Sequence, residues 1–178
     1  MNNRFIISPL QRKLLFFFVG LLTLVATTSA QGARRSIMEL PLFERAVLII
    51  KKFETLHRPC HWPAVGYGHM VQPGEPFRKG VQLSERQADA LLRQDLMKFV
   101  LLYKHMGMPN AILLGTLAYN IGPGAVNRST VYKKLKRGDR NIYKEYTAHC
   151  HYKGKWHRQL HQRRMTEYHL LFAASAKW

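Results

Sequence analysis

Acidic residues are scarce in this chain. Its 178 residues include 10 aspartates and glutamates against 28 lysines and arginines. Three of the basic residues precede Ala30 and all ten acids follow it, which leaves 25 basic against 10 acidic side chains and a net charge of +15. This excess predicts a polyanionic partner, because a balanced surface would also keep the protein soluble and without such self-repulsion. Nucleic acid and an anionic cell envelope both fit the charge.

Cysteine is nearly absent, with only Cys60 and Cys150. In an oxidising compartment these two residues could form a disulfide that closes a loop of about 90 residues. Two free thiols are the alternative, and geometry decides between them. The pairs Cys60-His61 and Cys150-His151 lack the CxxC or HxxxH spacing of a zinc site. We therefore predict neither a metal nor a cofactor.

The N-terminal apolar run is short. Residues 14–25 are uncharged and apolar, but a membrane-spanning helix needs about 20 such residues. Basic residues precede the run and the small residues Thr28-Ser29-Ala30 follow it, which is typical of a secretory signal peptide. We therefore predict that residues 1–30 are cleaved on export, with an uncleaved membrane anchor as the alternative. Export places the protein in the periplasm or cell envelope, and it therefore favours the envelope over nucleic acid as the polyanionic partner.

The rest of the chain has no internal repeat and no low-complexity tract, and it predicts one mostly helical domain. We expect a flexible lead at 31–40, the domain at 41–173 and a tail at 174–178. The apolar spacing and the capping residues predict helices over 42–54, from Ser84 to about 107, over 110–121, from 129 or 130 to 136, from Asp139 to about 149, and over 157–172. Residues 64–71 and 77–81 are expected to pair as a small β-hairpin, which makes the fold class α+β.

Glu54 is the residue with the clearest chemical role. It is the last residue of the helix predicted over 42–54. A carboxyl group at this position faces the negative end of the helix dipole, which favours its neutral form. A neutral carboxyl group can protonate a leaving oxygen. The position therefore indicates cleavage of a glycosidic bond.

Four segments carry a resemblance to a known family. They are Lys52-Phe53-Glu54, Gly66-Tyr67-Gly68-His69, residues 118–124 (AYNIGPG) with Ser129-Thr130 after them, and Arg163-Arg164-x-x-Glu167 with Leu171-Phe172 after it. In this order and spacing the segments resemble the phage-type, T4-lysozyme-like glycoside hydrolases. The resemblance implies a mostly helical domain with a small β-lobe and a glycan cleft between them. It also implies hydrolysis of the β-1,4 bond between N-acetylmuramic acid and N-acetylglucosamine, with Glu54 as the general acid.

The chain departs from the family at the acid's usual partners. The family has an aspartate in the hairpin after the acid and a threonine just before the G-Y-G-H segment, and these residues position the attacking water. Here residues 55–65 contain no acidic residue, and Ala64 occupies the threonine position. Thr55 stands where a glycine often follows the acid.

Three interpretations of the site stay open. In a muramidase, His57 or His61 would replace the missing carboxylate as the base that activates water. In a lytic transglycosylase, the hydroxyl of the sugar itself attacks, so that one carboxylic acid suffices. In a catalytically silent module, the chain binds peptidoglycan and does not cut it.

The remaining candidates would bind substrate or support the acid. Trp62, Tyr67 and Tyr119 could stack on sugar rings, and His69 and Asn120 could also reach the cleft, with packing roles as the alternative for each. Arg163 or Arg164 could pair with Glu54, as the closing helix does in the family. We predict a monomer that acts on peptidoglycan strands, has no specific nucleic-acid partner, and opens the wall locally for an envelope-spanning secretion or transfer apparatus.

Overall fold

The structure is a computed structural model that describes residues 36–173. The predicted signal peptide, most of the predicted lead and the predicted tail lie outside these residues. All of the helices and strands that the structure describes belong to the unit that begins at Ile37. Within residues 36–173, none of the helices combines the length and apolar character that a membrane crossing requires.

The first long helix has the predicted bounds. Helix α2 spans Leu42–Glu54, with Pro41 directly before its first turn. A short 3₁₀ turn, η1 (Ile37–Glu39), precedes it at the end of the segment predicted as a lead. One face of α2 is buried, so that the helix holds Glu54 at a fixed distance from the core.

The other long helices also follow their sequence signals. Helix α3 (Glu85–Leu102) begins at the capping box that Ser84 forms with Gln87, and η3 (Lys104–Met106) follows it. Helix α4 (Met108–Ile121) contacts α2, α3 and α5 and is buried along most of its length. Ser129 caps α6 (Thr130–Lys136). Helix α8 (Arg158–Glu167) continues into the π-helical turn η4 (Tyr168–Phe172), and together they cover the helix predicted over 157–172.

The hairpin lobe differs from the prediction. Strand β1 (Ala64–Val65) pairs antiparallel with β2 (His69–Met70), and a short 3₁₀ turn, η2 (Pro59–His61), precedes them. The prediction of a strand at 77–81 was wrong, since residues 79–80 form a turn and the others are irregular. Phe77 packs its ring against His69, with 5.5 Å between the ring centroids, so that side-chain packing takes the place of a β-ladder there.

Three elements of the C-terminal half were not predicted correctly. Helix α5 (Pro123–Arg128) forms where a break was expected, because proline suits the first turn of a helix. Helix α7 (Tyr143–Thr147) begins later than Asp139, whose carboxylate instead accepts the N–H of Asn141 at 2.8 Å. A second hairpin, β3 (His151–Tyr152) with β4 (Lys155–Trp156), occupies the predicted gap between helices.

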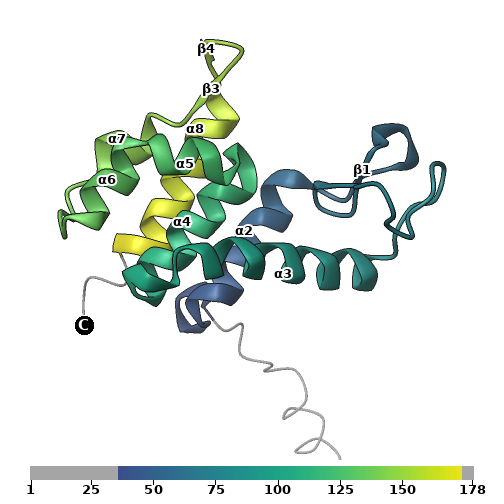
Figure 1. The fold of residues 1–178 in the computed structure, drawn as a ribbon, viewed down its shortest axis with the longest axis horizontal. Coiled ribbons are helices and arrows are strands. Elements are labelled where there is room, and N and C mark those ends of the chain that lie inside the picture. Colours follow the sequence, from purple (N-terminus) through teal and green to yellow (C-terminus); the bar gives the residue numbers. More distant parts are fainter. Residues whose placement is uncertain (1–35, 174–178) are drawn as a thin grey trace, which may run out of the picture. The chain divides into compact units, whose positions relative to one another are not determined.

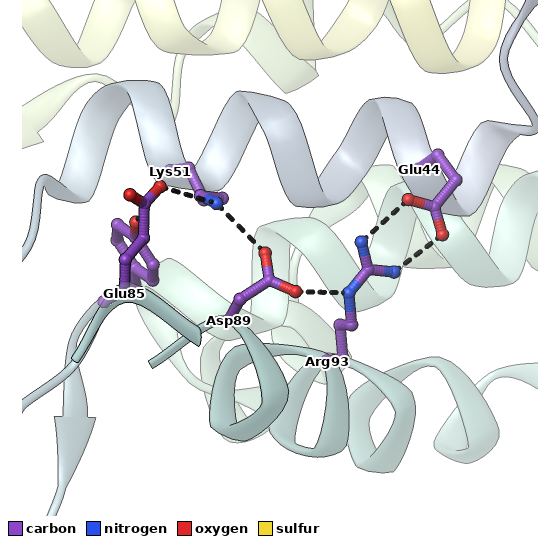
Figure 2. Close-up of polar contacts among 6 residues, drawn as sticks. Glu44, Lys51, Glu85, Asp89 and Arg93 are labelled. Carbon is purple, nitrogen blue, oxygen red and sulfur yellow. Dashed lines mark hydrogen bonds and ion pairs between the residues drawn. The ribbon is translucent and has the colours of Figure 1, made fainter. Parts of the chain in front are cut away.

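Ion pairs join α2 to α3 on their polar faces. Lys51 of α2 lies between Glu85 and Asp89 of α3, at 3.3 and 3.0 Å (Figure 2). Arg93 forms an ion pair with Asp89 at 2.6 Å and binds the Glu44 carboxylate through two nitrogens, at 2.6 and 2.9 Å. Figure 1 shows α3 running from the other helices to the lobe that carries β1. These pairs therefore help to set the helix that ends in Glu54 relative to the lobe.

Candidate active site

A groove of about 360 Å³ lies between the β1–β2 lobe and helices α3 and α4. Its lining includes Gly68, His69, Glu75, Asp95, Phe99 and Tyr119. The Glu54 carboxylate lies beside the groove wall, because a Cβ placed on Gly68 would lie 3.6 Å from Glu54 Oε2 and 3.9 Å from Tyr119 Cε1. The Glu54 side chain is 22% exposed. The predicted acid is thus partly buried and lies next to Gly68 of the groove wall, while its own side chain is not among the lining residues.

A buried cluster from α4, α7 and α8 holds this carboxylate. The Nη1 atom of Arg163 donates to Glu54 Oε1, and its Nε atom donates to Glu167 Oε1 at 2.9 Å. Arg164 is paired with Glu167 at 2.8 Å and donates to Asn120 Oδ1 at 2.7 Å. Of the two predicted arginines, Arg163 therefore contacts the acid, and Arg164 acts only through the rest of the cluster.

Tyr146 completes this cluster. Its hydroxyl donates to Glu167 Oε2 at 2.8 Å, and its side chain is fully buried. Burial, together with the nearby Glu167 carboxylate, raises the pKa of Tyr146 well above its usual value. The phenol therefore stays a hydrogen-bond donor and fixes the carboxylate that anchors Arg163.

The predicted water-activating histidines lie together after α2. The rings of His57 and His61 meet edge to face, with 5.0 Å between centroids. Burial and the charge of His61 lower the pKa of His57, and the Glu54 carboxylate opposes this shift. His61 Nδ1 accepts the backbone N–H of Arg58 at 3.1 Å. His57 and Trp62 line a small crevice on the lobe and are not part of the large groove's lining.

His69 lines the groove and has both ring nitrogens engaged. Its Nδ1 atom lies 2.6 Å from Asp95 Oδ2, and its Nε2 atom lies 2.8 Å from Glu75 Oε2. Glu75 also accepts the backbone N–H of Gln72 at 2.8 Å. Glu75 and Asp95 were not predicted as site residues, although the Pro-Gly-Glu-Pro turn at 73–76 places a carboxylate close after the hairpin.

Two predicted sugar-binding residues make contacts within the protein. Tyr67 is only 5% exposed, and its carbonyl accepts the Tyr119 hydroxyl at 2.9 Å, so its ring packs in the core. The Oδ1 atom of Asn120 accepts a hydrogen bond from Arg164, and Asn120 is not among the residues that line the groove. Tyr119 lines the groove together with Phe99.

The cysteines do not pair. Cys60 is exposed in η2 and Cys150 is buried directly before β3, and both are free. The disulfide that the sequence allowed is therefore absent. Among residues 36–173, no three histidine, cysteine or acidic side chains come close enough together to hold a metal ion.

A mostly helical domain, a small hairpin lobe and a groove bordered by an arginine-bound glutamate define a lysozyme-type domain. Residues 52–167 match the model of the phage lysozyme family, and the chain belongs to that family. It is 30% identical to an endolysin of Bacillus phage B103 over 108 residues, which are 54% of this chain and 40% of the endolysin. The chain thus spans less than half the length of that relative.

Two solved structures have a similar fold. The muramidase domain of SpmX from Asticaccaulis excentricus matches with a TM-score of 0.61 and 26% identity, over 72% of this chain and 95% of that domain. An endolysin from the Escherichia coli O157:H7 phage FAHEc1 matches with a TM-score of 0.60 and 25% identity, over 76% of this chain and 96% of the endolysin. Both matches cover nearly the full length of the compared structure.

Proposed function

We propose that this protein is a peptidoglycan-cleaving muramidase that hydrolyses the β-1,4 bond between N-acetylmuramic acid and N-acetylglucosamine. The observation that carries the proposal is the position of Glu54, which borders the groove and is held there by Arg163. Membership of the phage lysozyme family and the resemblance to a muramidase domain support the same activity.

Glu54 acts as the general acid. It gives its proton to the glycosidic oxygen as the bond to the anomeric carbon breaks, and water adds to that carbon. Arg163 has an ionic partner whether Glu54 is protonated or deprotonated. It keeps a partner in Glu167 while Glu54 is protonated, and it stabilises the Glu54 carboxylate once the proton has left.

His57 and His61 are the candidates for the base that activates water, and burial lowers the pKa of His57, which favours the neutral imidazole that can accept a proton. Because His57 lines the separate crevice and not the groove, a base role for it requires that the attacking water lie on the crevice side of Glu54. The second candidate function is lytic transglycosylation, and the absence of any carboxylate in residues 55–65 favours it. In that reaction the hydroxyl of the muramic acid residue attacks, and no external base is needed.

The test is the digestion of purified peptidoglycan, followed by mass spectrometry of the products. A muramidase leaves reducing ends and a transglycosylase leaves anhydro ends, whereas intact glycan would overturn the proposal in favour of a silent binding module. We expect Glu54→Gln to lower turnover by at least about a hundredfold, the usual contribution of a general acid. The matched control Glu39→Gln changes an exposed carboxyl group outside the groove lining, and it should leave turnover unchanged.

The proposed setting is the cell envelope. The predicted signal peptide would export the enzyme, and its excess of basic residues suits an anionic wall. Local opening of the wall for a secretion or transfer apparatus is the role that we propose there.

A further inference from the structure

The β3–β4 hairpin is a feature that a glycan-cleaving site does not explain. Its two strands are joined by Lys153 and Gly154, both at positive φ (50° and 77°), as a tight two-residue hairpin turn requires. At its base, the N–H of His157 donates to the carbonyl of Cys150 at 2.8 Å, and Cys150 is buried. Figure 1 shows the hairpin projecting beyond α8. It is therefore an anchored projection.

Two large aromatic side chains are exposed on this hairpin. Tyr152 is 61% exposed and Trp156 is 57% exposed. The register pairs Tyr152 with Lys155 and His151 with Trp156. Because directly paired residues share a face and neighbours alternate, the two aromatic rings lie on opposite faces. They form the two sides of a wedge, whereas stacking on a sugar or a base requires a platform.

The charge around the wedge is of one sign. Lys153, Lys155 and Arg158 are exposed, and residues 146–166 contain no aspartate or glutamate. The acids that flank this stretch are engaged elsewhere. Glu145 pairs with Lys134 at 3.0 Å, and Glu167 is buried with the arginines of α8. The positive charge of the hairpin is therefore left for an external anion.

We propose that the β3–β4 hairpin docks on the surface of an anionic lipid bilayer. Tyrosine and tryptophan prefer the boundary between headgroups and acyl chains, and lysines beside them contact anionic headgroups. The exposed strand edges limit the depth of insertion, since unpaired backbone groups are costly in hydrocarbon. This inference does not depend on the enzymatic activity.

The first test measures binding of the full chain to phosphatidylglycerol-containing vesicles by co-sedimentation. Replacing both hairpin lysines (Lys153→Gln with Lys155→Gln) should weaken binding about thirtyfold, the effect of losing two lysine contacts with an anionic surface. The matched control, Lys133→Gln with Lys136→Gln, removes the same charge from exposed positions of α6. It should weaken binding by less than about threefold, because charges away from the docked surface are screened. Equal losses in the two variants would overturn the proposal.

The second test measures whether the hairpin itself contacts the bilayer. The chain has three tryptophans, so Trp62→Phe with Trp178→Phe leaves Trp156 as the only one. Brominated lipid should quench its fluorescence in anionic vesicles and not in phosphatidylcholine vesicles. Unquenched Trp156, or a hairpin that binds soluble polyglycerol phosphate but not vesicles, would overturn the inference.

Discussion

Thr55 shows how a single residue departs from its usual backbone conformation at the end of α2. Its φ is 56° and its ψ is 165°, a region that essentially only glycine occupies without strain. The strain lies directly after the proposed acid. The sequence indicated this position, because a glycine often follows the acid in the family.

Replacing Thr55 by glycine should stabilise the fold. Relief of the strain, of about 1–3 kcal/mol, exceeds the loss of about 1 kcal/mol from the greater freedom of an unfolded glycine. We expect a net gain of about 1 kcal/mol in the free energy of unfolding, measured in urea. Thr55→Ala keeps the Cβ atom and should show no such gain. A glycine variant that is less stable than the parent would contradict the conformation described here.

His69 should make stability depend on pH. Burial acts to lower the pKa of His69, but the hydrogen bonds with Glu75 and Asp95 outweigh it and raise this pKa above the unfolded value of about 6.5. The stabilisation is therefore fully present below about pH 6.5 and is lost as the pH rises through the raised folded-state pKa.

The measurement compares the parent with His69→Gln in urea unfolding at several pH values. We expect a loss of about 2 kcal/mol near pH 6, typical of buried hydrogen bonds to charged groups, and a smaller loss at each higher pH. His105→Gln, at an exposed position on η3, is the control and should give only a small change in the free energy of unfolding. If the loss caused by His69→Gln grew with rising pH, the pKa of His69 in the folded protein would be lowered and not raised.

At the scale of elements, the contact between α3 and α4 depends on one glycine. A Cβ atom on Gly115 would lie 2.8 Å from Val100 Cγ2, 2.9 Å from Val100 N and 3.0 Å from Val100 Cα. Two of these atoms belong to the backbone, so they cannot move aside by a change of rotamer. The axes of the two helices are therefore as close as they can be at this point.

Gly115→Ala should accordingly destabilise the protein, although alanine is the better helix former. Overpacking costs about 1–3 kcal/mol, and the gain in helix propensity of about 1 kcal/mol offsets only part of it. Thermal unfolding should show a lower Tm. In Gly124→Ala on α5, the new Cβ atom meets nothing closer than an arginine side chain at 3.6 Å. This control should have an equal or higher Tm, and an equal rise in both variants would refute the close approach of α3 and α4.

The elements that the sequence predicted well share local signals. Helices α2, α3 and α6 follow from apolar periodicity and from caps within a few residues, as at Ser84 and Ser129. The failures lack such signals. The strand predicted at 77–81 depended on pairing with residues 64–71, which instead pair among themselves. Helix α5 was missed because its glycine and proline also indicate a break.

At the scale of the whole molecule, the excess of 28 basic over 10 acidic residues governs association with polyanions. If the substrate is an anionic wall, raising the salt concentration from about 0.05 M to about 0.5 M should screen the attraction. We expect KM on whole walls to rise by about tenfold and kcat to change little. Short, uncharged glycan fragments are the control. An equal rise of KM on these fragments would remove charge as the cause.

The sequence by itself determined the family, the helix that ends in Glu54, the presence of a hairpin after it and the basic character of the chain. The helix, the hairpin and the charge follow from neighbouring residues or from composition, and the family follows from the order and spacing of four short segments. Only the tertiary structure decided which arginine meets the acid, because adjacent residues point about 100° apart around a helix and Arg163 lies 109 residues from Glu54. It likewise turned Tyr67 inward and gave His69 its two carboxylates, since such contacts depend on how packed helices are rotated about their axes.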